Sequence, residues 1–192
     1  MTTSAPSDYP ATLSIDYPDR DLDRLSSFFR LIWAIPVWIV LATLNGILFP
    51  AVLLMIVFRQ KYPRWWYDFN LELSRFTLRV EAYQALMSDA YPSTDEEQYV
   101  HLELEYPDAQ RDLNRWLPLV KWFLAIPHVV VLFFLTIGAV FAVIFAWFAI
   151  LFTGRYPRGL FDFVEGVMRW WMRVSAYAFL LTTDRYPPFQ LT

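Results

Sequence analysis

The chain has no cysteine, and its 192 residues include only two histidines and five glycines. The absence of cysteine excludes a disulfide framework, a thiolate metal site and a cysteine nucleophile. Neither His101 nor His128 has neighbouring Asp or Glu residues in a metal-ligand pattern. Walker-type glycine-rich loops, His-Glu-x-x-His and Gly-x-Ser-x-Gly are also missing. Because no catalytic constellation can be assembled, we expect a protein that is not an enzyme and holds no cofactor or metal.

Charge is missing from two long stretches of the sequence. No Asp, Glu, Lys or Arg occurs from Leu31 to Phe58 or from Trp122 to Gly154. Uncharged apolar runs of eighteen or more residues are typical of membrane-embedded segments, whereas buried core helices seldom reach this length. The runs therefore predict an integral membrane protein. A proton or ion pathway needs ionisable groups at membrane depth, so their absence argues against a pump or transporter.

The remaining charge is nearly balanced, with a formal net charge of −3. A balance of this kind does not suggest binding to nucleic acid, and we expect no nucleic-acid partner. The first 27 residues are polar, so the first apolar run begins too late and runs too long for a cleavable signal peptide.

An internal duplication organises the chain. Ile-Asp-Tyr-Pro-Asp at 15–19 resembles Leu-Glu-Tyr-Pro-Asp at 104–108, Ala-Ile-Pro at 34–36 recurs at 125–127, and Tyr-Pro-Arg at 62–64 recurs at 156–158. The order of the matching segments is preserved, which indicates two copies of one unit. We therefore divide the chain into a disordered N-terminus (1–8), repeat unit 1 (9–92), a solvated linker (93–98) and repeat unit 2 (99–192).

Each unit begins with a predicted strand, at 12–17 and at 99–106. Val100, Leu102 and Leu104 alternate with polar residues, which is the period of a half-buried strand. Asp19 or Asp108 is then a candidate helix cap before the apolar run. The fold class we expect is a mainly α membrane protein, in which a duplicated unit combines a short β-strand, an apolar helical hairpin (or a long single span) and an interfacial amphipathic helix.

The apolar runs are too long for simple spans. As single helices, 31–58 and 122–154 would measure about 42 and 50 Å, against a hydrocarbon core of about 30 Å. Asn45-Gly46 and Gly138 are candidate breaks near their middles. Arg and Lys flank both ends of each run, and cationic flanks prefer the cytoplasm. Hairpins, which return both ends to one side, are therefore favoured over single spans, with the polar parts mostly cytoplasmic.

The helix predicted after each run carries a stripe of acidic and Arg residues beside an apolar stripe. Trp65-Trp66 and Trp170-Trp171 suit the head-group region, so these helices are expected to lie in the interface. The charged stripe has two interpretations. One is a solvated face of ion pairs, and the other is a site where arginines grasp lipid phosphates. The residues concerned are Asp68, Arg75, Arg79, Asp162, Arg169 and Arg173.

The second unit contains Arg-Tyr-Pro-Arg-Gly-Leu-Phe-Asp-Phe at 155–163, Arg-Trp-Trp-Met-Arg-Val at 169–174 and Asp-Arg-Tyr-Pro-Pro-Phe at 184–189. These segments resemble the bacterial DUF4389 family. The first unit is similar but departs from this pattern, with Arg-Gln-Lys at 59–61 where unit 2 has Thr-Gly-Arg. The resemblance implies two tandem copies and a membrane location. It supplies no activity and no catalytic residue, because the family is one of unknown function.

Together these features lead us to expect a non-enzymatic protein of the bacterial inner membrane, either multi-pass or hairpin-inserted. It would act as a scaffold, accessory subunit or membrane-shaping component of a larger assembly, because exposed strand edges and interfacial helices can dock a partner. Its expected partners are membrane lipids and either another protein or a second copy of itself. The alternative is a lipid-binding or lipid-handling protein that uses the Arg pairs on its interfacial helices.

Overall fold

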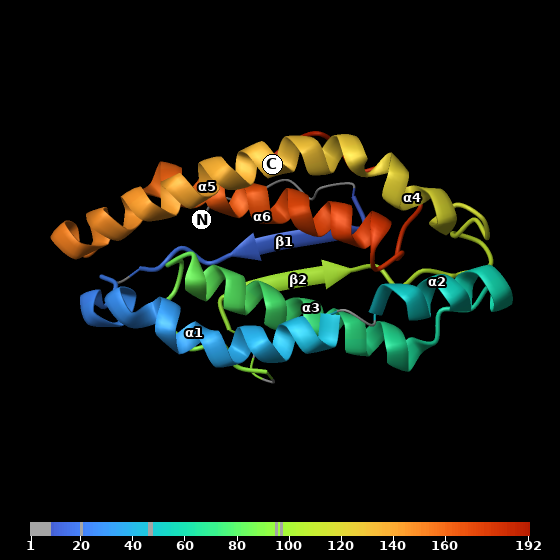
Figure 1. Cartoon of the computed structure of the whole chain (residues 1–192), viewed down its shortest axis with the longest axis horizontal. Helices are drawn as coiled ribbons and strands as arrows, with labels where there is room; N and C mark the ends of the chain where they lie inside the picture. Colours follow the sequence, from blue (N-terminus) through green and yellow to red (C-terminus); the bar gives the residue numbers. More distant parts are fainter. Residues whose placement is uncertain (1–8, 20, 46–47, 95, 97) are drawn as a thin grey trace.

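The elements of the chain repeat one order, a strand followed by apolar helices and an amphipathic helix (Figure 1). The structure is a computed structural model that describes residues 9–19, 21–45, 48–94, 96 and 98–192. The N-terminus predicted to be disordered, 1–8, lies outside the described residues. The elements are β1 (Ala11–Ile15), α1 (Arg24–Asn45), α2 (Leu48–Arg59), α3 (Arg64–Gln84), β2 (Val100–Leu104), α4 (Pro118–Leu124), α5 (Ile126–Thr153) and α6 (Arg158–Ala178).

The two predicted strands form one antiparallel pair, with Leu13 opposite Leu102. Each strand is somewhat shorter than predicted, and each presents alternate residues to the core. Leu13 and Leu102 are buried, whereas Ser14 and Glu103 are exposed on the other face. The sheet therefore has one apolar and one polar face, as the alternating sequence pattern predicted.

Each amphipathic helix covers the strand that belongs to the other repeat unit. Helix α6 packs on β1, and α3 packs on β2. The Nε of Arg169 donates a hydrogen bond to the carbonyl of Leu13 at 2.8 Å, and the Nε of Arg75 donates to the carbonyl of Leu102 at 3.1 Å. Because the strands also pair with each other, the two units are interlocked and share one core.

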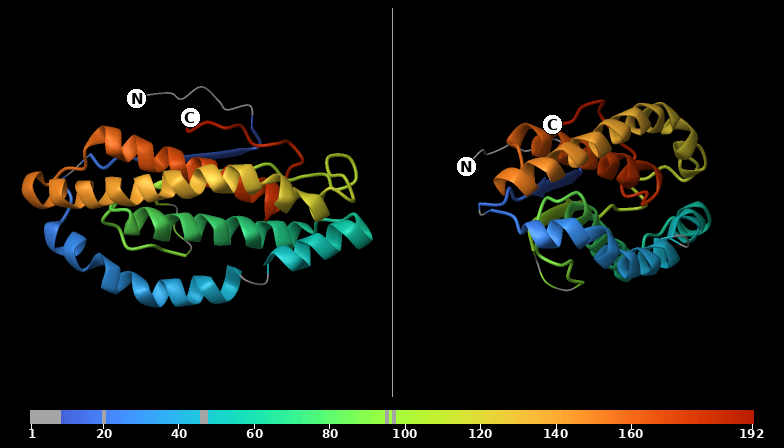
Figure 2. Two further views of the ribbon diagram at one scale, coloured as in Figure 1. Left: turned by 45° about the horizontal axis from the view of Figure 1, so that its top comes forward. Right: turned by 60° about the vertical axis from the view of Figure 1, so that its left-hand side comes forward.

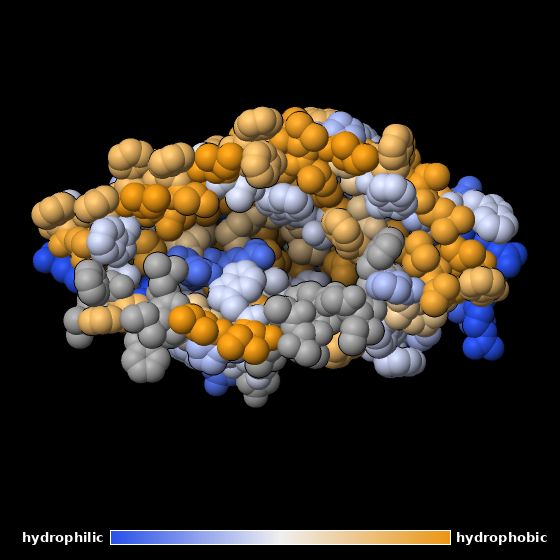
Figure 3. All heavy atoms as spheres, in the orientation of Figure 1, coloured by the Kyte–Doolittle hydropathy of each residue, from blue (hydrophilic) through white to orange (hydrophobic). Residues whose placement is uncertain are grey.

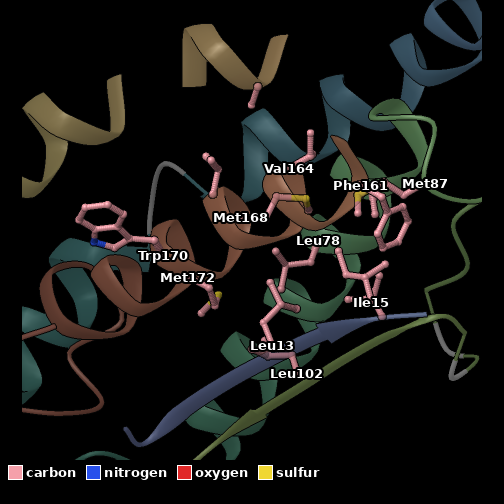
Figure 4. Packing of buried hydrophobic residues seen from close by; sticks show 14 of the residues in the cluster. Leu13, Ile15, Leu78, Met87, Leu102, Phe161, Val164, Met168, Trp170 and Met172 are labelled. Carbon is pink, nitrogen blue, oxygen red and sulfur yellow. The ribbon is translucent and has the colours of Figure 1, made fainter. Parts of the chain in front are cut away.

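The elements form three layers, which Figure 2 shows from two further sides. The sheet is the first layer, α3 and α6 form the second, and the apolar helices form the third, with α5 on α6 and α1 on α3. Figure 4 shows Leu13 and Leu102 of the sheet next to Leu78 and Met172 of the middle layer, whereas Val164 lies on the side of α6 that faces away from the sheet. This arrangement corrects the interfacial placement predicted for the helix after the second apolar run, because the apolar stripe of α6 is buried between the sheet and α5.

Neither apolar run forms a hairpin. Helix α5 is continuous through Gly138 and ends at Thr153. The next residue, Gly154, caps the helix with a φ of 77°, the left-handed conformation that glycine adopts easily. The ring of Phe163 packs 3.5 Å from the point where a Gly138 Cβ would lie. In the first run α1 ends at Asn45 and α2 begins at Leu48, and the glycine of the predicted break, Gly46, lies outside the described residues. Helix α2 continues away from α1 instead of returning along it (Figures 1 and 2). The predicted hairpins are therefore wrong, and the long single helix describes α5.

The helix starts also differ from prediction. Helix α1 begins at Arg24, and the carboxylate of Asp23 accepts a 3.3 Å hydrogen bond from the backbone of Ser26. Asp19 lies too far ahead to cap it. Asp108 accepts a hydrogen bond from the backbone of Gln110 at 3.0 Å, but this contact closes a turn ahead of α4.

Tertiary contacts recur in the two units. The hydroxyl of Tyr106 donates to the carbonyl of Tyr62 at 2.6 Å, and that of Tyr17 donates to the carbonyl of Tyr156 at 2.5 Å. Each pair joins the end of a strand to the Tyr-Pro-Arg turn of the other unit. The duplication in sequence is thus matched by a duplication of side-chain roles.

A buried cation near the start of the apolar helices recurs in the same way. The guanidinium of Arg30 lies 2.5 Å from Asp89, and the ammonium of Lys121 lies 2.6 Å from Asp184. Arg30 and Lys121 are both fully buried. Lys121 also donates to the carbonyl of Thr183 at 2.6 Å. These pairs fasten the segment that follows each amphipathic helix to the beginning of the apolar layer.

Replacing Asp184 by Asn should destabilise the fold strongly, because it leaves the Lys121 ammonium buried without a counter-charge. We expect a loss of about 3–5 kcal/mol in the free energy of unfolding, measured by denaturant titration in a mild detergent. Asp162→Asn is the matched control, since Asp162 forms an exposed pair with Arg158 at 3.0 Å. Its expected cost is below about 1 kcal/mol. Equal effects of the two substitutions would contradict this assignment.

Candidate functional site

Two arginines of the charged stripe, for which lipid-phosphate binding was one of the two interpretations, are buried. Arg79 is 3% exposed and Arg173 is 1% exposed. Arg79 donates from Nη1 to the carbonyl of Ser93 at 3.0 Å, and Arg173 donates from Nη2 to the carbonyl of Thr192 at 2.7 Å. These two guanidinium groups point into the protein, where each binds the segment that follows its own amphipathic helix.

The other predicted residues are more accessible. Arg75 pairs with Glu72 at 2.7 Å and Arg169 with Glu165 at 2.6 Å, in addition to their bonds to the strands. These two pairs agree with the interpretation of the stripe as a face of ion pairs. Asp68 and Asp162 lie at the surface, paired with Arg64 at 3.6 Å and Arg158 at 3.0 Å. Binding of head groups by this stripe stays a prediction of the sequence, and the structure does not gather the stripe into one site.

The residues of the stripe also cap the outer edges of the sheet. The carbonyls of Leu13 and Leu102 accept from Arg169 and Arg75, and the backbone N–H of Ile15 donates to the Glu165 carboxylate at 3.1 Å. Capped edges are poor templates for an added strand. The expectation that strand edges dock a partner therefore loses support at these positions.

A groove that the sequence did not reveal lies between α3 and α6 and opens between α5 and α1. Figure 3 shows this face hollowed between the two apolar helices, with hydrophobic residues along α5. The groove has a main compartment of about 800 Å³ and an adjoining one of about 570 Å³, which share Glu81, Thr136, Ala139, Val164 and Met168. Volumes of this size accommodate small-molecule ligands.

The walls of the main compartment are mostly apolar. They are contributed by α5 and α6, with further residues from α1 and α3. An enclosed apolar wall favours a hydrocarbon ligand, because each buried methylene group contributes about 0.8 kcal/mol. The apolar lining residues are Trp38, Ala85, Leu86, Ala139, Val140, Val143, Ile144, Trp147, Phe148, Val164 and Met168.

Glu81 is the one carboxylate among the described residues that line the groove. Part of its surface is reached through the opening, but its surroundings are protein atoms, and this burial raises the pKa of Glu81 to about 7. Among the described side chains, no cation and no hydrogen-bond donor contacts the carboxylate. The repeat places Ser175 at the equivalent position of unit 2, where it also lines the groove. That departure from the repeat was the available sequence signal.

Arg30 is the only cationic residue among the described lining residues. Its Nη atoms donate hydrogen bonds to the carbonyls of Tyr83 and Ser88, at 2.9 and 2.8 Å, and to the carboxylate of Asp89 at 2.5 Å. Its Nε has no hydrogen-bond partner among the residues that the structure describes. The charge of Arg30 is thus neutralised by Asp89, while one buried N–H group is left to donate.

His128 lies in an aromatic cluster and not in a metal site. The ring of Phe189 stacks on it at 3.8 Å between centroids, and the Nε1 of Trp170 donates to its Nδ1 at 3.1 Å. Because an indole N–H can only donate, Nδ1 is the acceptor. Within the described part of the chain, no group of three or more His, Cys, Asp or Glu side chains could hold a metal ion.

The outer face of α5 borders the groove opening and is exposed. Within the described residues, α5 is the one helix that is long and apolar enough to cross a membrane, and only 22% of its most apolar window is buried. A core helix of a soluble protein would be mostly buried. Large exposed side chains on α5 are Phe133, Phe134, Phe141, Phe145, Phe148 and Phe152.

Comparison with protein families gave two matches within the chain. The model described as "Domain of unknown function (DUF4389)" matches residues 24–94 and 116–190. The first match covers α1 to α3, and the second covers α4 to α6. Strand β1 lies before the first match, and β2 lies between the two matches. None of the curated proteins and none of the solved structures in the comparison matches the chain.

The raised pKa of Glu81 predicts that the protein loses stability as pH rises. The folded state keeps its proton up to about pH 7, whereas the unfolded chain releases it near 4.5, so ionisation opposes folding between these values. The slope is at most about 1.4 kcal/mol per pH unit, and access to solvent through the opening reduces it. Glu81→Gln should remove this component from unfolding curves recorded from pH 4.5 to 8.

Glu103→Gln provides the control, because Glu103 is exposed on the polar face of the sheet. It should keep the pH profile of the unsubstituted protein. If Glu81→Gln left that profile unchanged, the carboxylate would not be desolvated in the way described.

Proposed function

The chain belongs to the DUF4389 family and carries two tandem copies of this domain of unknown function. From its surface and its groove, we propose that it is a non-enzymatic membrane protein, embedded in the membrane by one face, that binds lipid in the groove. The observation that carries this proposal is the position of the opening. The groove opens between α5 and α1, on the side of the molecule where α5 exposes its phenylalanine side chains.

Embedding from one face follows from the order of the layers. The sheet presents Ser14 and Glu103 on its outer side, and the opposite side of the molecule presents α5 and its exposed phenylalanines. Contiguous apolar patches formed by many large side chains are rare on soluble monomers. Each large apolar side chain transferred from water to lipid stabilises membrane binding by about 1.5–3 kcal/mol. With α5 lying along the membrane, the apolar layer enters lipid while the sheet stays in water.

This orientation also accounts for the cationic residues at both ends of α5. Arg111 and Arg115 precede the apolar layer of unit 2, and Arg155 and Arg158 follow α5. A helix in the plane of the membrane keeps both groups on one side, as cationic flanks prefer. A spanning α5 would instead carry α6, with its Glu165 and Arg169, to bilayer depth. The multi-pass arrangement in the bacterial inner membrane expected from the sequence is the competing topology.

Single cysteines should distinguish the two topologies, because the natural chain contains none. We expect Gln110→Cys and Arg155→Cys, both at exposed positions that flank the apolar segment of unit 2, to be labelled by an impermeant maleimide from the same side of sealed vesicles. Cells labelled before lysis and inverted vesicles supply the two sides. Labelling from opposite sides would establish a spanning α5, and recovery of the protein in the soluble fraction would contradict embedding altogether.

Lipid binding is tested by filling the groove. Val143→Trp places a large ring in the main compartment, whereas Phe141→Trp alters an exposed position of the same helix. Native mass spectrometry of protein purified in mild detergent should find bound lipid on the unsubstituted protein and on Phe141→Trp, and at least a several-fold loss on Val143→Trp. A lipid-free unsubstituted protein, or equal occupancy in both variants, would contradict the proposal.

A second candidate is the scaffold or accessory subunit expected from the sequence. The observation in its favour is an aromatic surface around α4, away from the groove, where Trp116, Trp122 and Phe123 are all more than half exposed. Exposed aromatic side chains of this kind are common anchors of protein interfaces. Loss of a co-purifying protein on substitution of Trp122, with lipid still bound, would favour this role.

A further inference from the structure

Among the described lining residues of the groove, Glu81 is the one acidic group, and the other polar side chains are uncharged except for Arg30. Resting on the lipid-binding function proposed above, we infer that the ligand is an amphiphile whose head group carries a protonated amine, with Glu81 as its counter-charge. The hydrocarbon tail lies along α5 and α6, and the ammonium group meets the carboxylate on α3.

The charge of Glu81 has no internal compensation among the described residues. Arg30, the other charged group of the lining, already pairs with Asp89 at 2.5 Å and with two backbone carbonyls. The described lining residues from α5 and α6 are apolar or carry hydroxyl groups. An ionised carboxylate in such surroundings is costly, and a bound cation relieves that cost. An uncharged head group would leave it uncompensated, and an anionic one would be repelled.

The fold itself does not require the carboxylate. The repeat places Ser175 at the equivalent position, with the same secondary structure and on the same groove. Among the described residues, no ion pair or hydrogen bond joins the Glu81 carboxylate to the rest of the fold, whereas Glu72 and Glu165 pair with arginines. A residue that raises the energy of the empty groove without supporting the structure is best explained by a ligand that uses it.

Three probes with the same tail test the inference: dodecylammonium, dodecanol and dodecanoate. Each is titrated calorimetrically at about pH 8.5 into the full-length protein in a neutral detergent, with protein-free micelles as the blank. Dodecylammonium should bind about ten-fold or more tightly than dodecanol, and dodecanoate should bind most weakly. Glu81→Gln should bring the ammonium and alcohol affinities close together, while Glu103→Gln should keep the ten-fold preference.

The pH dependence gives an independent readout. Near pH 5.5 Glu81 is protonated while the amine keeps its charge, so the ammonium preference should shrink in the unsubstituted protein. In Glu81→Gln, the ratio of ammonium to alcohol affinity should not change with pH. Arg30 and Asp89, the other charged groups near the groove, are present in both proteins.

The outcomes separate the two levels of the proposal. If all three probes bind equally to the unsubstituted protein and Val143→Trp abolishes their binding, the groove binds lipid and the inference about the amine is overturned. If no probe binds, or Val143→Trp binds like the unsubstituted protein, both the inference and the lipid-binding function fall. Retention of the ammonium preference by Glu81→Gln would also overturn the inference.

Discussion

The structure depends on the bond between an arginine of each amphipathic helix and the strand of the other repeat unit. Arg169 holds Leu13, and Arg75 holds Leu102. The bonds satisfy outward carbonyl groups at the edges of a sheet of only two strands, which would be marginal on its own. They also fix the distance between sheet and helices, so the apolar helices are left to form an outer layer. The same arginines that look like a lipid-binding stripe in the sequence therefore hold the two units together.

The contacts that hold the fold together recur in both repeat units, whereas two chemically distinctive residues occur in one unit alone. Cation–carboxylate pairs and tyrosine–carbonyl contacts recur in both units. Glu81 replaces a serine, and His128 replaces a valine. The first substitution puts an uncompensated carboxylate in the groove, and the second fills an aromatic cluster. The contacts that recur in both units therefore join the same segments twice, whereas Glu81 and His128 have no counterpart of the same residue type in the other unit.

Sequence patterns predicted the features that depend on local order. The alternation of apolar and polar residues predicted both strands, and the length of the uncharged runs predicted the apolar helices. The matching segments in preserved order predicted the two copies, which the family matches confirm. The hairpins failed because a glycine within a helix was taken as a break, although Phe163 packs against Gly138 and the helix continues. The interfacial helices failed because amphipathicity cannot tell a lipid surface from the apolar face of a sheet. The groove and the buried state of Arg79 and Arg173 depend on packing between distant segments, which no local pattern encodes.

The central claim is that the apolar helix layer lies in lipid while the polar face of the sheet lies in water. Spin labels at Phe145→Cys on α5 and Glu103→Cys on β2 test it, since these residues face opposite sides of the layered fold and Phe145 is 64% exposed. In reconstituted vesicles, the collision rate with oxygen should dominate at position 145, and that with a water-soluble nickel chelate should dominate at position 103. High accessibility to the nickel chelate at both positions would contradict the account.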